Sequence, residues 1–112
     1  MSRNLKLLLE DIIEACDLIA SYVAGFDFER FQHDPKTQDA VIRRFEIVGE
    51  AVKGLEEQVK AMEPTIAWRQ IAGFRDVLAH AYFAVDVSIV WDAAVRQAPK
   101  LRTGCHRLRE RL

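Results

Sequence analysis

Apolar residues recur at steps of three and four along most of this chain, and that period indicates α-helices rather than strands. The first repeat covers residues 5–23 and places its members on one helix face: Leu5, Leu8, Leu9, Ile12, Ile13, Cys16, Ile19, Ala20 and Val23. Gly25 predicts a stop, because glycine favours the position after a helix end. No segment alternates as a strand does, and no repeat or low-complexity stretch competes.

The second predicted helix begins at Asp34-Pro35, with Asp34 as the N-cap and Pro35 at the first helical position. A heptad-like seam then alternates steps of four and three before Pro64 ends the helix: Val41, Phe45, Val48, Val52, Leu55, Val59 and Met62. Such a seam suits packing between near-parallel helices. The preceding segment, FDFERFQHDP (26–35), is expected to be a loop.

Two more helices and a C-terminal segment follow. Thr65 predicts the cap of a third helix that ends near Tyr82 or Phe83, Asp86 predicts the cap of a fourth, and Pro99 marks a kink or a fresh start. The third helix carries Ile66, Ile71, Phe74, Val77, Leu78 and Ala81. The fourth has Val87, Val90, Trp91, Ala94 and Ala98 facing inward, and the last, basic helix carries Leu101, Cys105, Leu108 and Leu112. We therefore predict an all-α fold, an antiparallel four-helix bundle plus a C-terminal helix, in a single domain over residues 1–112.

Composition limits the class of protein. The chain has 112 residues, of which 50% are apolar, so we expect one domain with a further apolar face to bury, and hence an oligomer. Charges interrupt every apolar stretch well before the roughly 20 residues that a membrane span needs, and no signal peptide is expected. Cys16 and Cys105 lack CxxC spacing and are interpreted as reduced core residues of a cytoplasmic protein.

Basic residues gather at the C-terminal end of a chain whose net charge is −1. Only Glu110 opposes the C-terminal basic strip, which consists of Arg96, Lys100, Arg102, Arg107, Arg109 and Arg111. Two interpretations stay open, a surface that meets phosphate and a solvated helix face. No cluster of Cys or His, no phosphate-binding glycine loop and no Ser or Cys nucleophile motif occurs, so we expect no metal and no cofactor.

Gly49 and Glu50 are unusual residues for the middle of the second predicted helix. Glycine there costs about 1 kcal/mol relative to alanine, and close approach of another helix would offset that cost. For Glu50 we favour a surface pair with Lys53 or Arg43 on the same helix. The alternative is that Glu50 orients a basic residue of a functional site.

The stretch GFRDVLAHAY (73–82) places several polar groups of different chemistry in an apolar run. Asp76 and His80 are four residues apart and can touch on a helix, while Arg75 and Tyr82 share a face. Arg75 and His80 lie roughly 140° apart around the axis, so they converge only if a second copy, as in a two-fold dimer, or a helix end at His80 brings them together. The alternative is a purely structural role, in which the stretch is a salt-bridged helix with a buried tyrosine.

Arg75, His80 and Tyr82 match the pattern RX4HXY, and this spacing resembles the HepT-like toxins of the HEPN superfamily. Three blocks extend the resemblance over nearly the whole chain: RRFEIVGEAVKGL (43–55), WRQIAGFRDVLAHAYFAVDVSIVW (68–91) and APKLR (98–102). The resemblance implies a HEPN-like helical homodimer whose motifs line one cleft. It also implies a metal-independent ribonuclease toxin of a type VII-like toxin–antitoxin pair. Its cognate antitoxin would be a minimal, MntA-like nucleotidyltransferase that transfers AMP to Tyr82.

The residue types suit RNA cleavage. RNA carries its own nucleophile, the 2′-OH, so His80 of each subunit could transfer protons while Arg75 binds the scissile phosphate. Asp76 would support His80, and Tyr82 could stack on a base or bind phosphate. The alternative from another class is a non-catalytic nucleotide- or RNA-binding helical subunit that partners a nucleotidyltransferase.

Overall fold

The protein folds into helices along the described part of the chain. A computed structural model describes residues 4–80 and 85–112, with the backbone alone for His80. The elements are α1 (Leu5–Val23), α2 (Phe28–Gln32), α3 (Pro35–Lys53), α4 (Glu57–Lys60), α5 (Trp68–His80), α6 (Val87–Asp92), the π-helical turn η1 (Ala93–Gln97) and α7 (Ala98–Arg111). The expected all-α fold is confirmed, and no described helix is long and apolar enough to cross a membrane.

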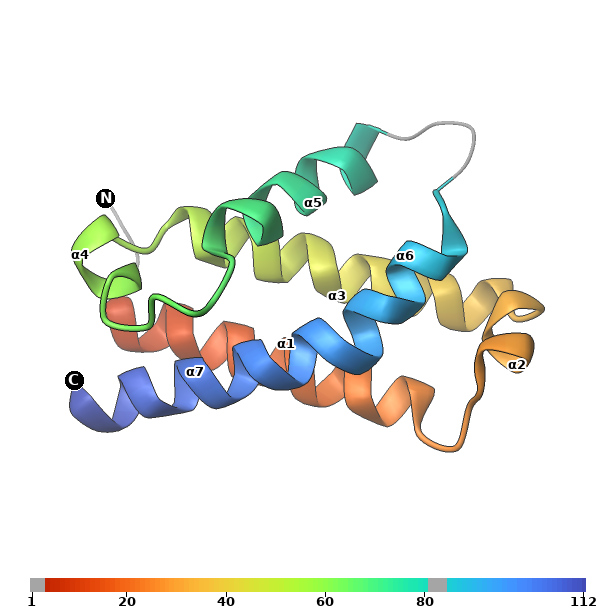
Figure 1. Cartoon of the computed structure of the whole chain (residues 1–112), viewed down its shortest axis with the longest axis horizontal. Helices are drawn as coiled ribbons and strands as arrows, with labels where there is room; N and C mark the ends of the chain where they lie inside the picture. Colours follow the sequence, from red (N-terminus) through yellow and green to blue (C-terminus); the bar gives the residue numbers. More distant parts are fainter. Residues whose placement is uncertain (1–3, 81–84) are drawn as a thin grey trace.

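The long helices alternate in direction along the bundle (Figure 1). α1 packs against both α3 and α7, and α3 packs against both α1 and α5. α5 therefore lies at the edge, with α3 as its main partner. α6, η1 and α7 follow one another without a break, so the predicted fourth helix and C-terminal helix form one run that contains a π-helical turn near Pro99.

The core contains most of the apolar faces predicted from the period. The face of α1 is buried from Leu8 to Ile19, and the seam of α3 is buried at Val41, Phe45, Val48 and Val52. Cys16 and Cys105 are buried and free, and burial is the main cause that raises the pKa of each thiol to about 12. These thiols therefore contribute to packing as small apolar groups, as the sequence predicted.

Two boundaries differ from the expectation near α2 and α3. The predicted loop contains α2, whose N-cap Asp27 accepts a hydrogen bond from the Arg30 amide, and whose Phe31 is fully buried beside Trp91. The second helix ends at Lys53 rather than near Met62, because Gly54 and the next amide bond back to carbonyls three residues earlier. Beyond that end the chain folds back through α4, which keeps the seam residues Leu55 and Val59 buried and Met62 partly buried.

α5 also begins later than expected, at Trp68 rather than after Thr65. The indole Nε1 of Trp68 donates to the carbonyl oxygens of Lys60 at 3.0 Å and Glu63 at 3.1 Å, which holds the segment before the helix in a non-helical turn. Val77 is 60% exposed, so this apolar residue of α5 lies outside the core. Ala81 and the predicted helix end near Tyr82 or Phe83 lie outside the described residues.

A buried carboxylate, Glu63, joins the segment between α4 and α5 to the last helix. Arg107 Nη2 donates to Glu63 Oε1 at 2.6 Å, and Arg111 Nη2 donates to Oε2 at 2.8 Å. The hydrogen bonds from Arg107 are the main cause that holds the pKa of Glu63 below its ordinary value. The charged pairing offsets the cost of burying a carboxylate, and it fixes the turn that leads into α5.

Candidate active site around Arg75

Arg75 lies on the face of α5 that packs against α3, directly over Gly49. A Cβ atom built on Gly49 would lie 2.1 Å from Arg75 Cβ and 2.7 Å from Arg75 Cγ. No side chain fits between the two helices at this point, so glycine allows the close approach that the sequence predicted. The aliphatic stem of the Arg75 side chain is thereby fixed against α3, while its guanidinium head lies at the side of the α3–α5 interface.

The guanidinium of Arg75 lies between two carboxylates. Its Nη2 is 3.4 Å from Glu50 Oε2, and its Nη1 donates to Asp76 Oδ1 at 3.5 Å. Its Nε is buried and has no hydrogen-bond partner among the described residues. The side chain is only 30% exposed, so packing and charge both restrict where the guanidinium can point.

Glu50 contacts Arg75 rather than a base of its own helix. The favoured expectation, a pair with Lys53 or Arg43, is wrong: Lys53 reaches Asp76 on α5, and Arg43 lies 3.5 Å from Glu46. The alternative, in which Glu50 holds a basic residue of the site, describes the observed contact. Sequence spacing could not reveal it, because Glu50 and Arg75 meet only through the packing of α3 on α5.

Asp76 receives two cations on one oxygen. Lys53 Nζ donates to Asp76 Oδ1 at 2.5 Å, and Arg75 approaches the same oxygen. The hydrogen bond from Lys53 is the main cause that lowers the pKa of Asp76, so this carboxyl is ionised at neutral pH. Glu50, Arg75, Asp76 and Lys53 form one chain of alternating charge, which we call the Arg75 network. The expected contact of Asp76 with the imidazole of His80 lies outside the described side chains, and so does Tyr82.

An open hollow of about 440 Å³ adjoins the Arg75 network between α1 and α3. Its charged lining consists of Asp11, Glu46 and Glu50 with Arg43 and Arg75. Acidic side chains outnumber basic ones there, which disfavours a polyanion inside the hollow itself. Sequence reasoning missed Asp11 and Glu46 as neighbours of Arg75, because both resemble ordinary exposed helix residues.

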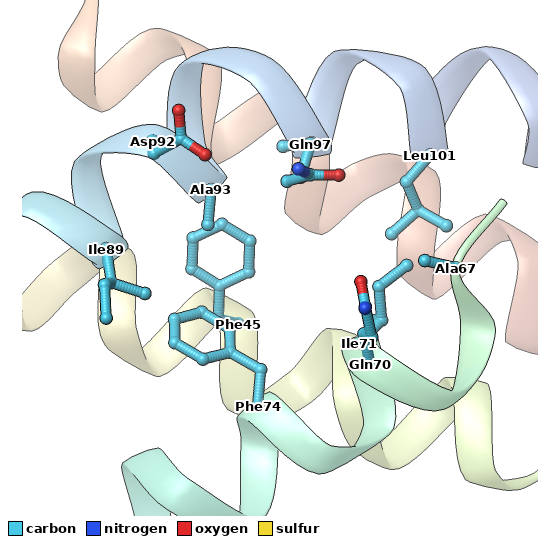
Figure 2. A pocket seen from close by; sticks show the side chains of 11 residues that line it. Phe45, Ala67, Gln70, Ile71, Phe74, Ile89, Asp92, Ala93, Gln97 and Leu101 are labelled. Carbon is cyan, nitrogen blue, oxygen red and sulfur yellow. The ribbon is translucent and has the colours of Figure 1, made fainter.

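A second, apolar groove lies on the other side of α5, towards α6, η1 and α7 (Figure 2). It has a volume of about 230 Å³, and Phe45 and Phe74 meet edge to face at its base, with ring centroids 5.4 Å apart. Ile89 lines one edge and is 55% exposed. The remaining lining comes from Ala67, Gln70, Ile71, Asp92, Ala93, Gln97, Ala98 and Leu101. An apolar groove on the helix that carries Arg75 is a candidate contact surface.

Most residues of the C-terminal basic strip form ion pairs within the protein. Arg102 pairs with Asp17, Arg96 with Asp92, and both Arg107 and Arg111 with Glu63. Along the described ranges, Lys100 and Arg109 have no ion pair. Three carboxylates thus face six basic residues, and the strip keeps a net positive charge that is compatible with either interpretation. Across residues 4–80 and 85–112, no group of three or more His, Cys, Asp or Glu could hold a metal ion.

The family model described as Ribonuclease HepT-like matches residues 12–108, and the chain belongs to this family. It is 44% identical over 110 residues to "Probable ribonuclease HepT" of Thermococcus cleftensis, covering 98% of this chain and 100% of that protein. It is 39% identical over 93 residues to "Putative RNase TTE0752" of Caldanaerobacter subterraneus subsp. tengcongensis, covering 83% of each chain. No solved structure matches it.

Proposed function

We propose that the protein is a metal-independent endoribonuclease toxin that cleaves RNA with Arg75 and His80. The position of Arg75 carries this proposal: its stem is packed over Gly49, and its head is held between Glu50 and Asp76. A guanidinium fixed before the substrate arrives loses little freedom when it binds a phosphate. The names of the relatives, which describe ribonucleases, supply the class of reaction.

The reaction needs no nucleophile from the protein. The 2′-OH of the ribose loses its proton to His80 of one subunit and attacks the adjacent phosphorus, while the bond to the 5′ oxygen breaks. His80 of the second subunit gives a proton to that leaving oxygen. Arg75 binds the non-bridging oxygens, whose negative charge grows in the transition state. The products are a 2′,3′-cyclic phosphate and a free 5′-OH.

Purified protein incubated with RNA in excess EDTA tests the activity. We expect cleavage without a divalent metal, products that end in a 2′,3′-cyclic phosphate or its hydrolysed form, and no cleavage by His80→Ala. RNA with a 2′-O-methyl group at the cut site should resist, because its nucleophile is blocked. Cleavage of the methylated RNA, or cleavage only when metal is added, would rule this mechanism out.

A homodimer belongs to the proposal, because one chain has a single motif histidine and the reaction uses two. The groove beside α5 is an apolar surface on the helix that bears the motif, and we assign it to the partner subunit. Burying Phe74, Ile89 and the exposed Val77 would then place α5 of both subunits at the dimer interface. Two-fold symmetry places the same patch on both partners.

We expect a dimer by multi-angle light scattering at micromolar concentration, and a monomer for Ile89→Glu, because a carboxylate at the groove edge would be buried without a partner. Leu7→Glu is the matched control. Leu7 is also an exposed apolar residue, at 47%, but it lies on α1 and does not line the groove. A monomeric wild-type protein would disprove the dimer. A dimeric Ile89→Glu variant would show that the interface lies elsewhere.

Tyr82 is the proposed point of control by a minimal nucleotidyltransferase antitoxin. Transfer of AMP from ATP forms a bond between the tyrosine oxygen and the α-phosphorus and releases pyrophosphate. Tyr82 comes seven residues after Arg75, two helical turns along the same face if the helix continued. A tethered nucleotide there would bind Arg75 through its phosphate and block RNA.

Intact-mass spectrometry after incubation with the partner enzyme and ATP should show added AMP units on the wild-type protein and none on Tyr82→Phe. The variant should keep the apolar ring and lose only the acceptor oxygen. We also expect the antitoxin to leave Tyr82→Phe fully toxic in cells. AMP units that persist on Tyr82→Phe would show that another residue is the acceptor.

A non-catalytic binding subunit is the second candidate, and one observation favours it. Both terminal nitrogens of Arg75 already face carboxylates, so the guanidinium must exchange at least one of these contacts to bind a phosphate. The EDTA assay separates the two candidates, because a binding subunit would retain RNA or nucleotide without cutting.

A further inference from the structure

We propose that Lys53 is a positioning residue for Arg75: it holds the Asp76 carboxylate so that Arg75 remains available to RNA phosphate. This inference rests on the proposed function, since it concerns how Arg75 meets RNA. Lys53 is the last residue of α3 and lies outside the motif that contains Arg75.

The distances within the Arg75 network show which cation holds Asp76 more tightly. Lys53 Nζ lies 2.5 Å from Asp76 Oδ1, whereas Arg75 Nη1 lies 3.5 Å from the same oxygen. The first is a short charge-assisted hydrogen bond, and the second is at the limit of a hydrogen bond. Of these two cations, Lys53 therefore holds Asp76 more closely, and both terminal nitrogens of Arg75 make only long contacts with their carboxylates.

The surroundings of Arg75 are acidic, so the contact of Lys53 with Asp76 affects the charge that a phosphate would meet. Glu50 and Asp76 contact Arg75, and Asp11 and Glu46 line the adjacent hollow, where Arg43 is already close to Glu46. With Lys53 present, the Arg75 network carries no net charge. Without Lys53, the other three members of the network would carry a net charge of about −1, which opposes an incoming phosphate.

The place of Lys53 in the fold suits this role. A cation at the C-terminal end of α3 interacts favourably with the helix dipole. Its side chain crosses from α3 to α5, the two helices whose contact fixes the stem of Arg75. The side chains of Lys53 and Asp76 are 40% and 51% exposed, and such a pair adds little to stability by itself. If Lys53 were only a tether between the helices, its removal should therefore change RNA affinity very little.

The test measures binding of a fluorescein-labelled 2′-O-methyl RNA, which cannot be cleaved, over a range of salt concentrations. We expect Lys53→Gln to raise Kd at least about tenfold at low salt, a change of roughly 1.4 kcal/mol. Lys53→Arg should restore most of the affinity, because it keeps the cation. Lys36→Gln is the matched control: Lys36 is an exposed lysine near the other end of the same helix.

Two double variants separate this role from simpler ones. Adding Asp76→Asn to Lys53→Gln should recover affinity, because the Asp76 carboxylate no longer competes for Arg75 and only Glu50 remains, whereas loss of a structural tether would not be repaired. In an Arg75→Ala background, Lys53→Gln should have no further effect on RNA affinity. If Lys53 itself bound phosphate, its removal would still lower the affinity. Either opposite result overturns the inference.

The wild-type results keep this inference separate from the proposed nuclease. If wild-type protein binds the methylated RNA but never cleaves ordinary RNA, the nuclease proposal fails and the role of Lys53 is still decided by the variants. If wild type cleaves and Lys53→Gln binds as wild type does, only the role of Lys53 fails. If wild type does not bind, both fail.

Discussion

Replacing Arg75 by alanine is expected to lower kcat/KM for RNA cleavage by about a hundredfold to a thousandfold, the usual loss when a preorganised charge-stabilising group is removed. The variant loses the one guanidinium that packing over Gly49 and pairing with Glu50 hold in place. It should stay helical, because Arg75 is 30% exposed and the apolar core does not include it.

Arg69→Ala is the matched control for that loss. Arg69 is an exposed arginine in the first turn of the same helix, so this variant removes an equal charge and an equal side chain away from the site. Single-turnover cleavage of a defined RNA, together with circular dichroism of each variant, gives the comparison. Wild-type cleavage by Arg75→Ala, or equal losses in both variants, would exclude Arg75 as the phosphate-binding residue.

Gly49→Ala should be the most disruptive small substitution in the described part of the bundle. The added methyl group would lie 2.1 Å from Arg75 Cβ, an atom too close to the backbone to rotate away, so α5 must move off α3. We expect a loss of about 1–3 kcal/mol in the free energy of unfolding, despite a helix-propensity gain of about 1 kcal/mol. Cleavage should fall as well, since Arg75 moves with α5.

Gly73→Ala gives the opposite expectation within α5. No atom lies within 4 Å of a Cβ at Gly73, so alanine should stabilise the protein by about 1 kcal/mol through helix propensity. Gly104→Ala is an intermediate case, because the atom it meets is the rotatable Cδ1 end of Ile66. Urea denaturation of the three variants measures the order, and a Gly49→Ala variant as stable as Gly73→Ala would contradict the observed packing.

Local pattern predicted the helices well and their ends less well. The period of apolar residues found the buried faces of α1 and α3, and Asp34 and Asp86 cap their helices as expected. The end of α3 at Lys53 was missed, because the seam continues in register through Leu55 and Val59. Those residues stay buried by a change of chain direction, which an apolar period cannot distinguish from a continuing helix.

The site was predictable only where its residues are neighbours in sequence. The motif pointed to Arg75, and Gly49 pointed to a close helix contact, but neither revealed that the two meet each other. The pairs of Glu50 with Arg75 and of Lys53 with Asp76 join helices through tertiary packing, and side-chain spacing along one helix favoured other partners. The pairing of Glu63 with Arg107 and Arg111 was missed for the same reason.

The π-helical turn η1 sets the rotational phase between α6 and α7. A π-turn accommodates one extra residue, and in a regular α-helix each residue accounts for about 100° of rotation. If Ala93–Gln97 formed regular α-helix with no residue removed, α6 would turn by about that angle relative to α7. Ile89 would then leave the edge of the groove beside α5 while the buried face of α7 kept its place. The shape of that groove therefore depends on the π-helical conformation of η1, as much as on the side chains that line it.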